Sequence, residues 1–590
     1  MPSAPGPSPS PRAGPPAPAP KAEARLSWRS EALLVGLACV LLLLLTALEA
    51  RRQTYPYFDD VTYLRLGHEV RALGGPLGLL RALFGGTFEE SNRHPLYLAL
   101  LGLIARPVPA YHREAQALTA ALGLLALLTC FWTVRRQLGA APAALVALLL
   151  SVSRTFVACS AREGCEPLLV VFWALAVGAV QDGLGEDGAR RRLAFLRAGL
   201  YSGLAFLTKG TGLFLPASLA LTFLVAEGLG AVKDLRAYAY AAGFLATASP
   251  LLVRNLRMFG SPFHNFNLGT LWQDRLPDFA EVYAPQAKLL LPHGFFDYLH
   301  QLTLGALGHR VVVGLGETLY LLADAMAPAG GSPDRPLSLA VYVLGDLVGA
   351  VAVVLALRHI AARPRGFGRS FLLVHAAFTF LFLFVFSVNG GNTRYFLPLA
   401  ATVLMPALSE RVLEGRGARA WRGSSLLAKT TGVVVLASLA AALLVHGPFL
   451  DKPGMEGARD FLVAHLRPGD TYAIDARSHV QLEWLLPRSN QLIVSASWRE
   501  RPVDTALMLD YLRARNVRFI LLDASSIANL ASPSDPAGRR YLFYDRMPLS
   551  AEGSLPREGV PEGLHIVYED PGSPRRFMVL EMDPAPVPRP

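Results

Sequence analysis

Long apolar stretches separated by short polar connections dominate the first 450 residues of the chain. The run from Ala32 to Leu48 carries no charge and, at about 1.5 Å per residue, is long enough to cross most of a bilayer. Comparable runs follow at about 115–134, 141–159, 167–181, 194–208, 211–226, 238–253, 337–357, 371–388, 395–410 and 426–446. The pattern therefore predicts an α-helical polytopic membrane protein with about eleven transmembrane helices.

The basic residues in the short connections predict how these helices are oriented. Arginine and lysine are abundant at one set of ends, beginning with Arg25 and Arg29, whereas the opposite short connections carry only Arg162, Lys209 and Arg394. Because positive residues favour the cytoplasmic side, the amino terminus is expected inside and the chain after residue 450 outside. These features predict a multi-pass protein of the cell inner (cytoplasmic) membrane.

One apolar segment, at 303–327, is interrupted by charged residues that include Arg310, Glu317 and Asp324. This pattern favours an amphipathic helix on the membrane interface over a crossing. If the segment does cross, the carboxyl terminus moves to the inside.

The chain divides into three regions. Residues 1–30 are rich in proline, alanine and serine and are predicted to form a disordered cytoplasmic tail. Residues 31–450 form the membrane domain, with long outer loops at 49–113 and 254–336. Residues 451–590 are predicted to form an extracytoplasmic α/β domain, because short apolar strands at 471–474, 491–494, 518–523, 565–568 and 577–581 alternate with helical segments.

The composition supports a membrane protein and excludes several other classes. Hydrophobic residues make up 52% of the 590 residues and charged residues only 17%, and the mean hydropathy is +0.35. Four cysteines give no disulfide framework. The net charge of +11 is spread between apolar blocks, which predicts contact with membrane lipid and no nucleic acid partner.

Two adjacent carboxylates, Asp59 and Asp60, open the first outer loop just beyond the first predicted helix. A carboxylate at the membrane surface can remove the proton from a hydroxyl group that attacks a sugar carbon. Neighbouring residues on a helix point in different directions, so only one of the two would reach a given proton. The alternative is structural: Asp59 caps a helix, and Asp60 is a first-turn acid that the helix dipole favours.

Four further motifs fall on the same outer side: NRHPLY at 92–97, REGCEPL at 162–168, LTKGTG at 207–212 and FGSPF at 259–263. As an ordered set, these motifs and the aspartate pair resemble the GT-C glycosyltransferases. The resemblance is to the bacterial integral-membrane relatives of the protein O-mannosyltransferases and of the lipid A aminoarabinose transferase. It covers roughly residues 31–270 and, more loosely, 370–410.

The resemblance implies a function and roles for three acids. It makes Asp59 the catalytic base, with Asp60 as the fallback, and it gives Glu166 the task of orienting the acceptor or the first loop. The implied donor is a sugar on polyprenyl phosphate, transferred with inversion to a glycan, lipid or protein acceptor. A phosphate leaves as a stabilised anion, so one carboxylate together with cations can suffice.

The cations that the resemblance assigns to the donor phosphate are Lys209, Arg254 and Arg394, with Arg162 as a weaker candidate. Arginine and lysine both suit a phosphate headgroup. Lys209 and Arg254 could instead anchor helix ends by reaching to the lipid headgroups. Arg162 could pair locally with its neighbouring glutamates. Tyr395 completes an arginine–tyrosine pair that is common in the family.

His94 is a candidate for the acceptor side of the first loop, and no cofactor is firmly implied. A divalent metal between His94, Glu89, Glu90 and His264 is possible, but the spacing gives it no independent support. The alternative is a histidine hydrogen-bonded before a proline turn. Within the apolar runs, Arg154 and Asp346 are expected to pair helices rather than to catalyse.

Two other functions stay open. A lipid-linked-sugar transporter or flippase would perform no covalent chemistry, but transporters tend to show repeated halves, which this sequence lacks. A noncatalytic scaffold with the same fold would have no need of Asp59, Asp60 and Glu166.

Overall fold

The computed structural model of the chain describes a helical bundle followed by a small sheet. The described residues are 27–51, 56, 59–106, 111–265, 300, 303–329, 336–387, 392–414, 455–475, 491–494, 509–510, 512–522, 562–569 and 577–583. Among the predictions above, the last apolar run at 426–446 and nearly all of the 1–30 tail lie outside these residues.

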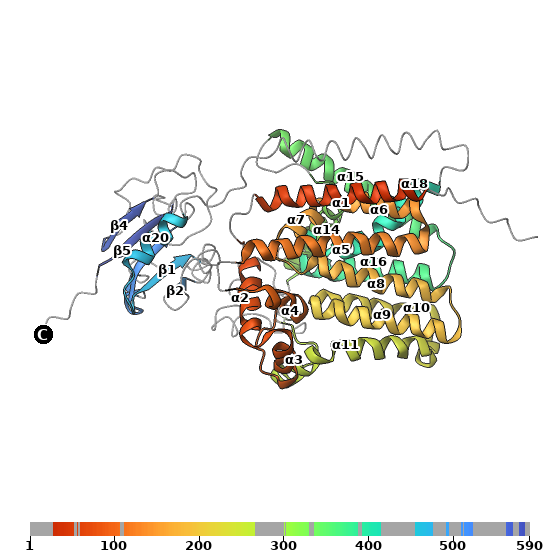
Figure 1. Ribbon diagram of the computed structural model, residues 1–590, viewed down its shortest axis with the longest axis horizontal. Helices are drawn as coiled ribbons and strands as arrows, with labels where there is room; N and C mark the ends of the chain where they lie inside the picture. The colour runs from red at the N-terminus through yellow and green to blue at the C-terminus, as the bar shows by residue number, and fades with distance from the viewer. Residues whose placement is uncertain are drawn as a thin grey trace, which may run out of the picture.

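Nine long helices build the described part of the bundle (Figure 1). They are α1 (Trp28–Arg51), α5 (His112–Leu138), α8 (Glu166–Leu184), α9 (Gly188–Thr208), α10 (Phe214–Glu227), α11 (Leu235–Phe259), α14 (Leu304–Ala325), α15 (Pro336–Ala362) and α16 (Phe367–Ser387). Their buried faces join in one continuous apolar core. The outward faces carry many exposed leucines and valines, as expected where lipid replaces water.

Six helical stretches in the described residues are long and apolar enough to cross a membrane. They are Trp28–Arg51, His112–Leu138, Glu166–Leu184, Gly210–Lys233, Tyr342–Ala362 and Phe367–Val385. The protein is therefore a mostly helical, multi-pass membrane protein. The predicted number of about eleven crossings is not confirmed by this set.

The remaining predicted crossings are either interrupted helices or helices that carry charged residues. The run at 141–159 is broken into α6 (Ala140–Ser151) and α7 (Arg154–Ala161). Ser153 starts the second helix, because its side chain accepts a hydrogen bond from the Phe156 amide at 3.4 Å. The run at 395–410 is divided among η5 (Thr393–Tyr395), α17 (Leu397–Leu399), the π-helix η6 (Ala400–Leu404) and α18 (Met405–Glu414). The runs at 194–208 and 238–253 lie in α9 and α11, both of which carry arginines.

Close glycine contacts hold α9 against α11. A Cβ atom added at Gly199 would lie 2.0 Å from the Tyr240 carbonyl oxygen, and one added at Gly243 would lie 2.3 Å from the Leu196 carbonyl oxygen. Small residues let membrane helices approach this closely and pack through their backbones.

The segment predicted as an interfacial amphipathic helix is α14, which is not among the six stretches apolar enough to cross a membrane, and its place at the interface stays a prediction. Arg310 and Asp324 are buried against the bundle, whereas Val312 and Leu319 on the outward face are 73% and 52% exposed. A helix at the interface would turn its charged side chains toward water. Arg310 and Asp324 instead face the bundle, whereas His309 on the same helix is exposed and Glu317 is partly buried.

Buried and partly buried charges join α7, α14 and α15. Arg154 donates to Asp324 at 2.5 Å and to Asp346 at 3.0 Å, and its guanidinium lies 3.6 Å from the centre of the Tyr342 ring. These contacts match the helix-pairing role that the sequence predicts for Arg154 and Asp346. We call Arg154, Asp324 and Asp346 the α7–α15 ion network.

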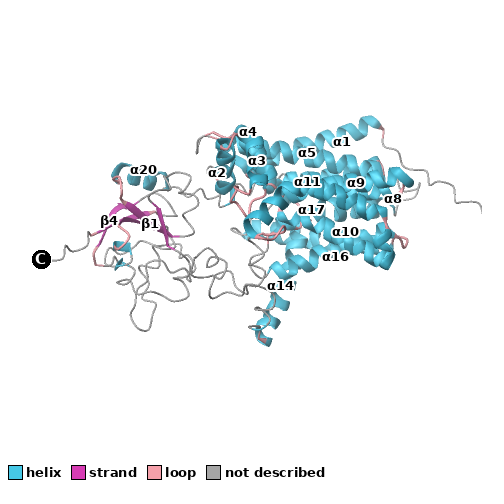
Figure 2. Cartoon of the chain, turned by 90° about the horizontal axis from the view of Figure 1, so that it is seen from below, coloured by secondary structure: helices cyan, strands magenta, loops and turns pink. Residues whose placement is uncertain are grey.

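Short helices form a layer across one end of the bundle. They are α2 (Asp59–Ala72), α3 (Gly75–Gly85) and α4 (Pro95–Ile104), all within the predicted first outer loop. Figures 1 and 2 both place this layer at the end of the bundle that faces the sheet. Two 3₁₀-helices, η1 (Gly210–Leu213) and η2 (Gly228–Lys233), flank α10 at its two ends.

The carboxyl-terminal region is a five-stranded mixed sheet with helix α20 (Met455–His465) beside it. The strands are β1 (Thr471–Asp475), β2 (Gln491–Val494), β3 (Val517–Leu522), β4 (Leu564–Glu569) and β5 (Met578–Met582), in the order β2-β1-β3-β5-β4. β1 pairs in parallel with β2 and β3, whereas β5 is antiparallel to β3 and β4. All five predicted strands are confirmed to within one residue at each end.

Candidate active site

Five charged side chains from four separate parts of the chain meet at the end of the bundle that carries α2 and α4. They are Asp59, Arg93, Glu166, Lys209 and Arg394. We call them the outer ion cluster because two of them belong to the predicted first outer loop. Asp59 accepts from Arg93 and, at 2.7 Å, from Arg394. Glu166 accepts from Lys209 at 2.6 Å and lies 3.5 Å from Arg394. Arg394 therefore bridges the two carboxylates.

Helix ends position the members of the cluster. Asp59 lies in the first turn of α2 and Glu166 is the first residue of α8, so both carboxylates lie where a helix dipole favours negative charge. Lys209 is the residue that ends α9. Arg394 lies in η5, where the Asn392 side chain accepts from its backbone amide at 3.1 Å.

Tyr395 lies beside the cations of the cluster. The Lys209 ammonium is 4.7 Å from the centre of the Tyr395 ring, and the guanidinium of Arg394 is 5.6 Å from it. An aromatic face at these distances attracts a cation, so Tyr395 helps to hold both groups at the cluster.

The cluster holds three cations against two carboxylates and is largely shielded from water. Only 17% of the Lys209 side chain and 3% of the Glu166 side chain are exposed. Burial by itself would raise the pKa of the Asp59 carboxyl, but the charges of Arg93, Arg394 and Lys209 hold that pKa well below its usual range. Burial opposes the charge of Arg394, yet Glu166 and Asp59 raise its pKa above the usual value.

Asp60 differs from its neighbour. It is buried, with 5% of its surface exposed, whereas Asp59 makes the ion pairs with the two arginines. The structure thus brings Asp59 into the cluster. Both belong to the first turn of α2, as the structural alternative requires, but the charge of Asp59 has arginine partners beyond its own helix.

Arg254 lies apart from the carboxylates of the cluster. It is 2% exposed and donates to the carbonyl oxygens of Glu90, at 2.5 Å, and Phe88, at 3.4 Å. These contacts tie α11 to the first outer loop. Arg254 and Lys209 both point to partners within the protein. Their contacts therefore do not match the alternative in which the two side chains reach out to lipid headgroups. Arg162 ends α7, and the adjacent Glu163 pairs with His112 of α5.

His94 is buried before Pro95 and donates a hydrogen bond from Nδ1 to the Phe206 carbonyl oxygen. Burial lowers the pKa of His94 to about 4; the Phe206 hydrogen bond opposes this shift, and the charges of Arg254 and Lys209 add to it. This environment agrees with the alternative of a hydrogen-bonded histidine before a proline turn.

The possible metal group is not assembled in the described residues. Glu90 accepts from the amides of Asn92, at 2.7 Å, and Arg93, at 2.8 Å. His264 stacks on Phe259 with ring centres 4.0 Å apart. In the part of the chain that the structure describes, no three histidine, cysteine, aspartate or glutamate side chains gather as metal ligands.

The sequence analysis did not select Arg93, which contacts Asp59 directly and lies with its guanidinium 5.7 Å from the Tyr63 ring centre. Its signal was present, because Arg93 is the second residue of the NRHPLY motif. A second layer was also missed: Tyr63 and Cys165 are hydrogen-bonded at 3.2 Å beneath the cluster.

The fold and this cluster define a multi-pass membrane protein with a shielded group of ion pairs at one end of its bundle. Residues 93–253 match the family model described as dolichyl-phosphate-mannose-protein mannosyltransferase. This match confirms the resemblance to the GT-C glycosyltransferases over that part of the chain, which contains three of the five cluster residues.

Several solved structures are similar to the chain. One is the archaeal oligosaccharyltransferase AglB from Archaeoglobus fulgidus, in complex with an inhibitory peptide and a dolichol-phosphate. It has 13% sequence identity and a TM-score of 0.48, and the similarity covers 85% of this chain and 70% of that one.

A second is ArnT from Cupriavidus metallidurans bound to undecaprenyl phosphate, with 15% identity, coverage of 94% and 99% and a TM-score of 0.41. A third is the protein O-mannosyltransferase Pmt1-Pmt2 complex of S. cerevisiae bound to the sugar donor, with 19% identity, coverage of 44% and 38% and a TM-score of 0.29. No curated protein matches the sequence.

Proposed function

We propose that the protein is an inverting glycosyltransferase that moves a sugar from a polyprenyl-phosphate donor to an acceptor on the outer face of the cytoplasmic membrane. The acceptor is a glycan, a lipid or a protein. The observation that carries the proposal is the outer ion cluster, in which Asp59 and Glu166 share Arg394 and cations outnumber carboxylates. The family match over residues 93–253 supports the same reaction class.

The positive excess suits a phosphate. Lys209 and Arg394 are held by carboxylates, and a phosphate diester is a competing acceptor that can take a forked bond from the arginine and a point charge from the lysine. The cations would also stabilise the negative charge that grows on the phosphate oxygen as the bond to the sugar breaks. The site therefore needs no general acid for the leaving group.

Asp59 serves as the base in this scheme. The acceptor hydroxyl oxygen attacks the anomeric carbon of the sugar, the bond from that carbon to the phosphate oxygen breaks, and the hydroxyl proton passes to Asp59. Polyprenyl phosphate departs with the bonding electrons, and attack from the opposite face inverts the anomeric centre. One base and one transferred proton balance the reaction.

Donor binding would also adjust the strength of the base. The arginines beside Asp59 keep the pKa of its carboxyl low, and a carboxylate held in this way is a weak proton acceptor. When a donor phosphate draws Arg394 toward itself, Asp59 loses part of that stabilisation and becomes more basic. The arrangement would thus couple proton removal to the presence of the donor.

Glu166 is assigned a positioning role, and its partner Lys209 remains a cation for the donor phosphate. Their contact joins the start of α8 to the end of α9, and Glu166 keeps Arg394 within reach of Asp59. Loss of Glu166 would leave the cations less well placed for both the phosphate and the base. Arg162, Arg254, His94 and Tyr395 are retained as candidate residues around the donor and acceptor.

The test is sugar transfer by the purified protein in liposomes supplied with a panel of polyprenyl-phosphate sugars. Asp59→Asn is expected to lower transfer by at least about 100-fold, because a positioned base contributes 10² to 10⁴. Glu69→Gln is the matched control, since it makes the same change at an exposed acid on the same helix, and it should retain full activity.

Other outcomes separate the alternatives. Activity in Asp59→Asn together with its loss in Asp60→Asn would move the base by one residue. Full activity in the double variant would overturn the mechanism. Movement of a lipid-linked sugar across the bilayer, with no new glycosidic bond formed, would show a transporter instead.

A further inference from the structure

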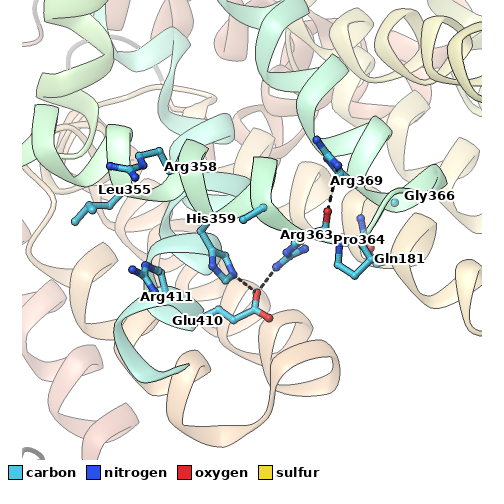
Figure 3. Close-up of a pocket in the computed structure, with 12 residues that line it drawn as sticks. Gln181, Leu355, Arg358, His359, Arg363, Pro364, Gly366, Arg369, Glu410 and Arg411 are labelled. Atoms are coloured by element: carbon cyan, nitrogen blue, oxygen red, sulfur yellow. Dashed lines mark hydrogen bonds and ion pairs between the residues drawn. The ribbon is translucent and has the colours of Figure 1, made fainter. Parts of the chain in front are cut away.

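A second charged region lies at the opposite end of the bundle from the outer ion cluster. It is a cavity of about 780 Å³ between the ends of α8, α15, α16 and α18 (Figure 3). Gln181, which lines it, lies fifteen positions after Glu166 on α8. At about 1.5 Å per residue, the cavity is roughly 22 Å from the cluster along the helix axis.

Arginines dominate the wall of the cavity. Arg358, Arg363, Arg369 and Arg411 line it together with one carboxylate, Glu410. Glu410 pairs with Arg363 and lies 3.1 Å from His359, as Figure 3 shows. Four arginines against one carboxylate leave the cavity strongly positive.

The four arginines differ in their contacts and in their exposure to solvent. Glu410 partly neutralises Arg363, and Arg369 donates to the Arg363 carbonyl oxygen at 3.3 Å. Arg358 and Arg411 have exposed side chains at the cavity wall. A fixed inner pair of arginines and an exposed outer pair can together surround an anion.

An apolar surface continues from this cavity along α15. Leu355 lines the cavity and is 37% exposed, and Val354, Val351 and Leu347 on the same helix are 55%, 60% and 60% exposed. A soluble phosphate would gain nothing from such a surface. A molecule with an anionic head and an apolar tail would contact both regions at once.

We propose that this cavity binds the phosphate of an anionic membrane lipid, with the arginines around the headgroup and an acyl chain along α15. Basic pockets between membrane helices recognise lipid phosphates through forked arginine bonds and point charges. The cavity volume falls within the range of small-molecule sites, which is about 300–1,000 Å³. The site is separate from the outer ion cluster and does not depend on the proposed reaction.

The test uses the full-length purified protein and native mass spectrometry with phosphatidylglycerol, phosphatidylcholine or inorganic phosphate added. We expect phosphatidylglycerol to bind at least about tenfold more tightly than phosphatidylcholine. Arg358→Gln with Arg411→Gln should abolish this preference, and both changes are at exposed residues that folding should tolerate. Arg369→Gln provides an independent third variant at the inner wall.

The matched control is Arg190→Gln with Arg192→Gln, which removes two exposed arginines from the start of α9 and should keep the lipid preference within about twofold. Equal loss in the control would overturn the proposal in favour of diffuse surface charge. Binding of inorganic phosphate that depends on Arg358 and Arg411, without any preference for phosphatidylglycerol, would overturn the lipid assignment. Equal binding of both lipids by the unaltered protein would do the same.

Discussion

Two buried networks in this protein share a motif, an arginine that bridges two carboxylates. In the outer ion cluster Arg394 lies 2.7 Å from Asp59 and 3.5 Å from Glu166. In the α7–α15 ion network Arg154 lies 2.5 Å from Asp324 and 3.0 Å from Asp346. The two arginines therefore have similar immediate partners.

The networks differ in the balance of charge around that motif. The outer cluster adds Arg93 and Lys209, so its cations outnumber its carboxylates. The α7–α15 network, within the residues that the structure describes, joins one arginine to two carboxylates. The excess of cations in the outer ion cluster can bind an anion. In the α7–α15 ion network the arginine is neutralised by two acids, and its contacts hold three helices together. The surroundings of an ion pair, rather than the pair itself, thus distinguish a reactive site from a structural one.

The largest expected effect of this difference is on stability. Arg154→Gln leaves the buried Asp324 and the partly buried Asp346 without their cation, and breaking a buried ion pair in this way costs about 3–5 kcal/mol. We expect a fall in the thermal unfolding midpoint of the purified protein. Asp324→Asn with Asp346→Asn, added to Arg154→Gln, should restore part of the loss because the uncompensated charges are gone. An unchanged midpoint in Arg154→Gln would show that this network does not hold the helices together.

The next effect is on catalysis and concerns Arg93. Arg93→Gln removes one of the two arginines that fix Asp59, and we expect kcat to fall by roughly tenfold, as for loss of one hydrogen bond to a charged group. KM for the donor should change little, since Lys209 and Arg394 are still present. Steady-state kinetics with the lipid-linked donor measure both constants. A rise in KM at constant kcat would instead assign Arg93 to donor binding.

A separate effect, on stability and not on catalysis, is expected from pH through His94, which is neutral in the fold. Its pKa is about 4 in the folded protein and about 6.5 when exposed, so the unfolded chain binds more protons between these values. Stability from this group is complete above pH 6.5 and is lost as the pH falls toward 4, by at most about 3 kcal/mol. Unfolding midpoints measured from pH 7.5 to 4.5 test this, and His94→Gln should flatten that part of the profile. Equal pH dependence in both proteins would contradict it.

The sequence could predict much of the outer cluster because topology constrains it. Glu166, Lys209 and Arg394 each lie next to the end of an apolar run, and Asp59 lies eleven positions beyond the first run; the orientation of the runs places those ends together. The order of the motifs was therefore enough to group four of the five charges. The five strands were equally accessible, since each is a short apolar run between polar segments.

Other features depend on contacts that no local pattern records. The outward face of α14 could not be foreseen, because the burial of Arg310 and Asp324 depends on distant helices such as α16 and α7. Arg254 contacts carbonyl oxygens 164 and 166 positions earlier in the chain. Hydropathy likewise could not predict the break between α6 and α7 near residue 152, because an apolar run has the same hydropathy whether or not its helix is interrupted.

The most direct test of the account is the affinity of the purified protein for polyprenyl phosphate. It is measured for the unaltered protein, for Arg394→Gln, and for a control variant that carries both Arg190→Gln and Arg192→Gln. If the outer ion cluster is the donor-phosphate site, Arg394→Gln should weaken binding by about 10- to 100-fold, the value of one charged hydrogen-bonded contact, while the control variant binds as the unaltered protein does. Equal affinities in all three proteins would contradict the assignment of this cluster to the lipid phosphate.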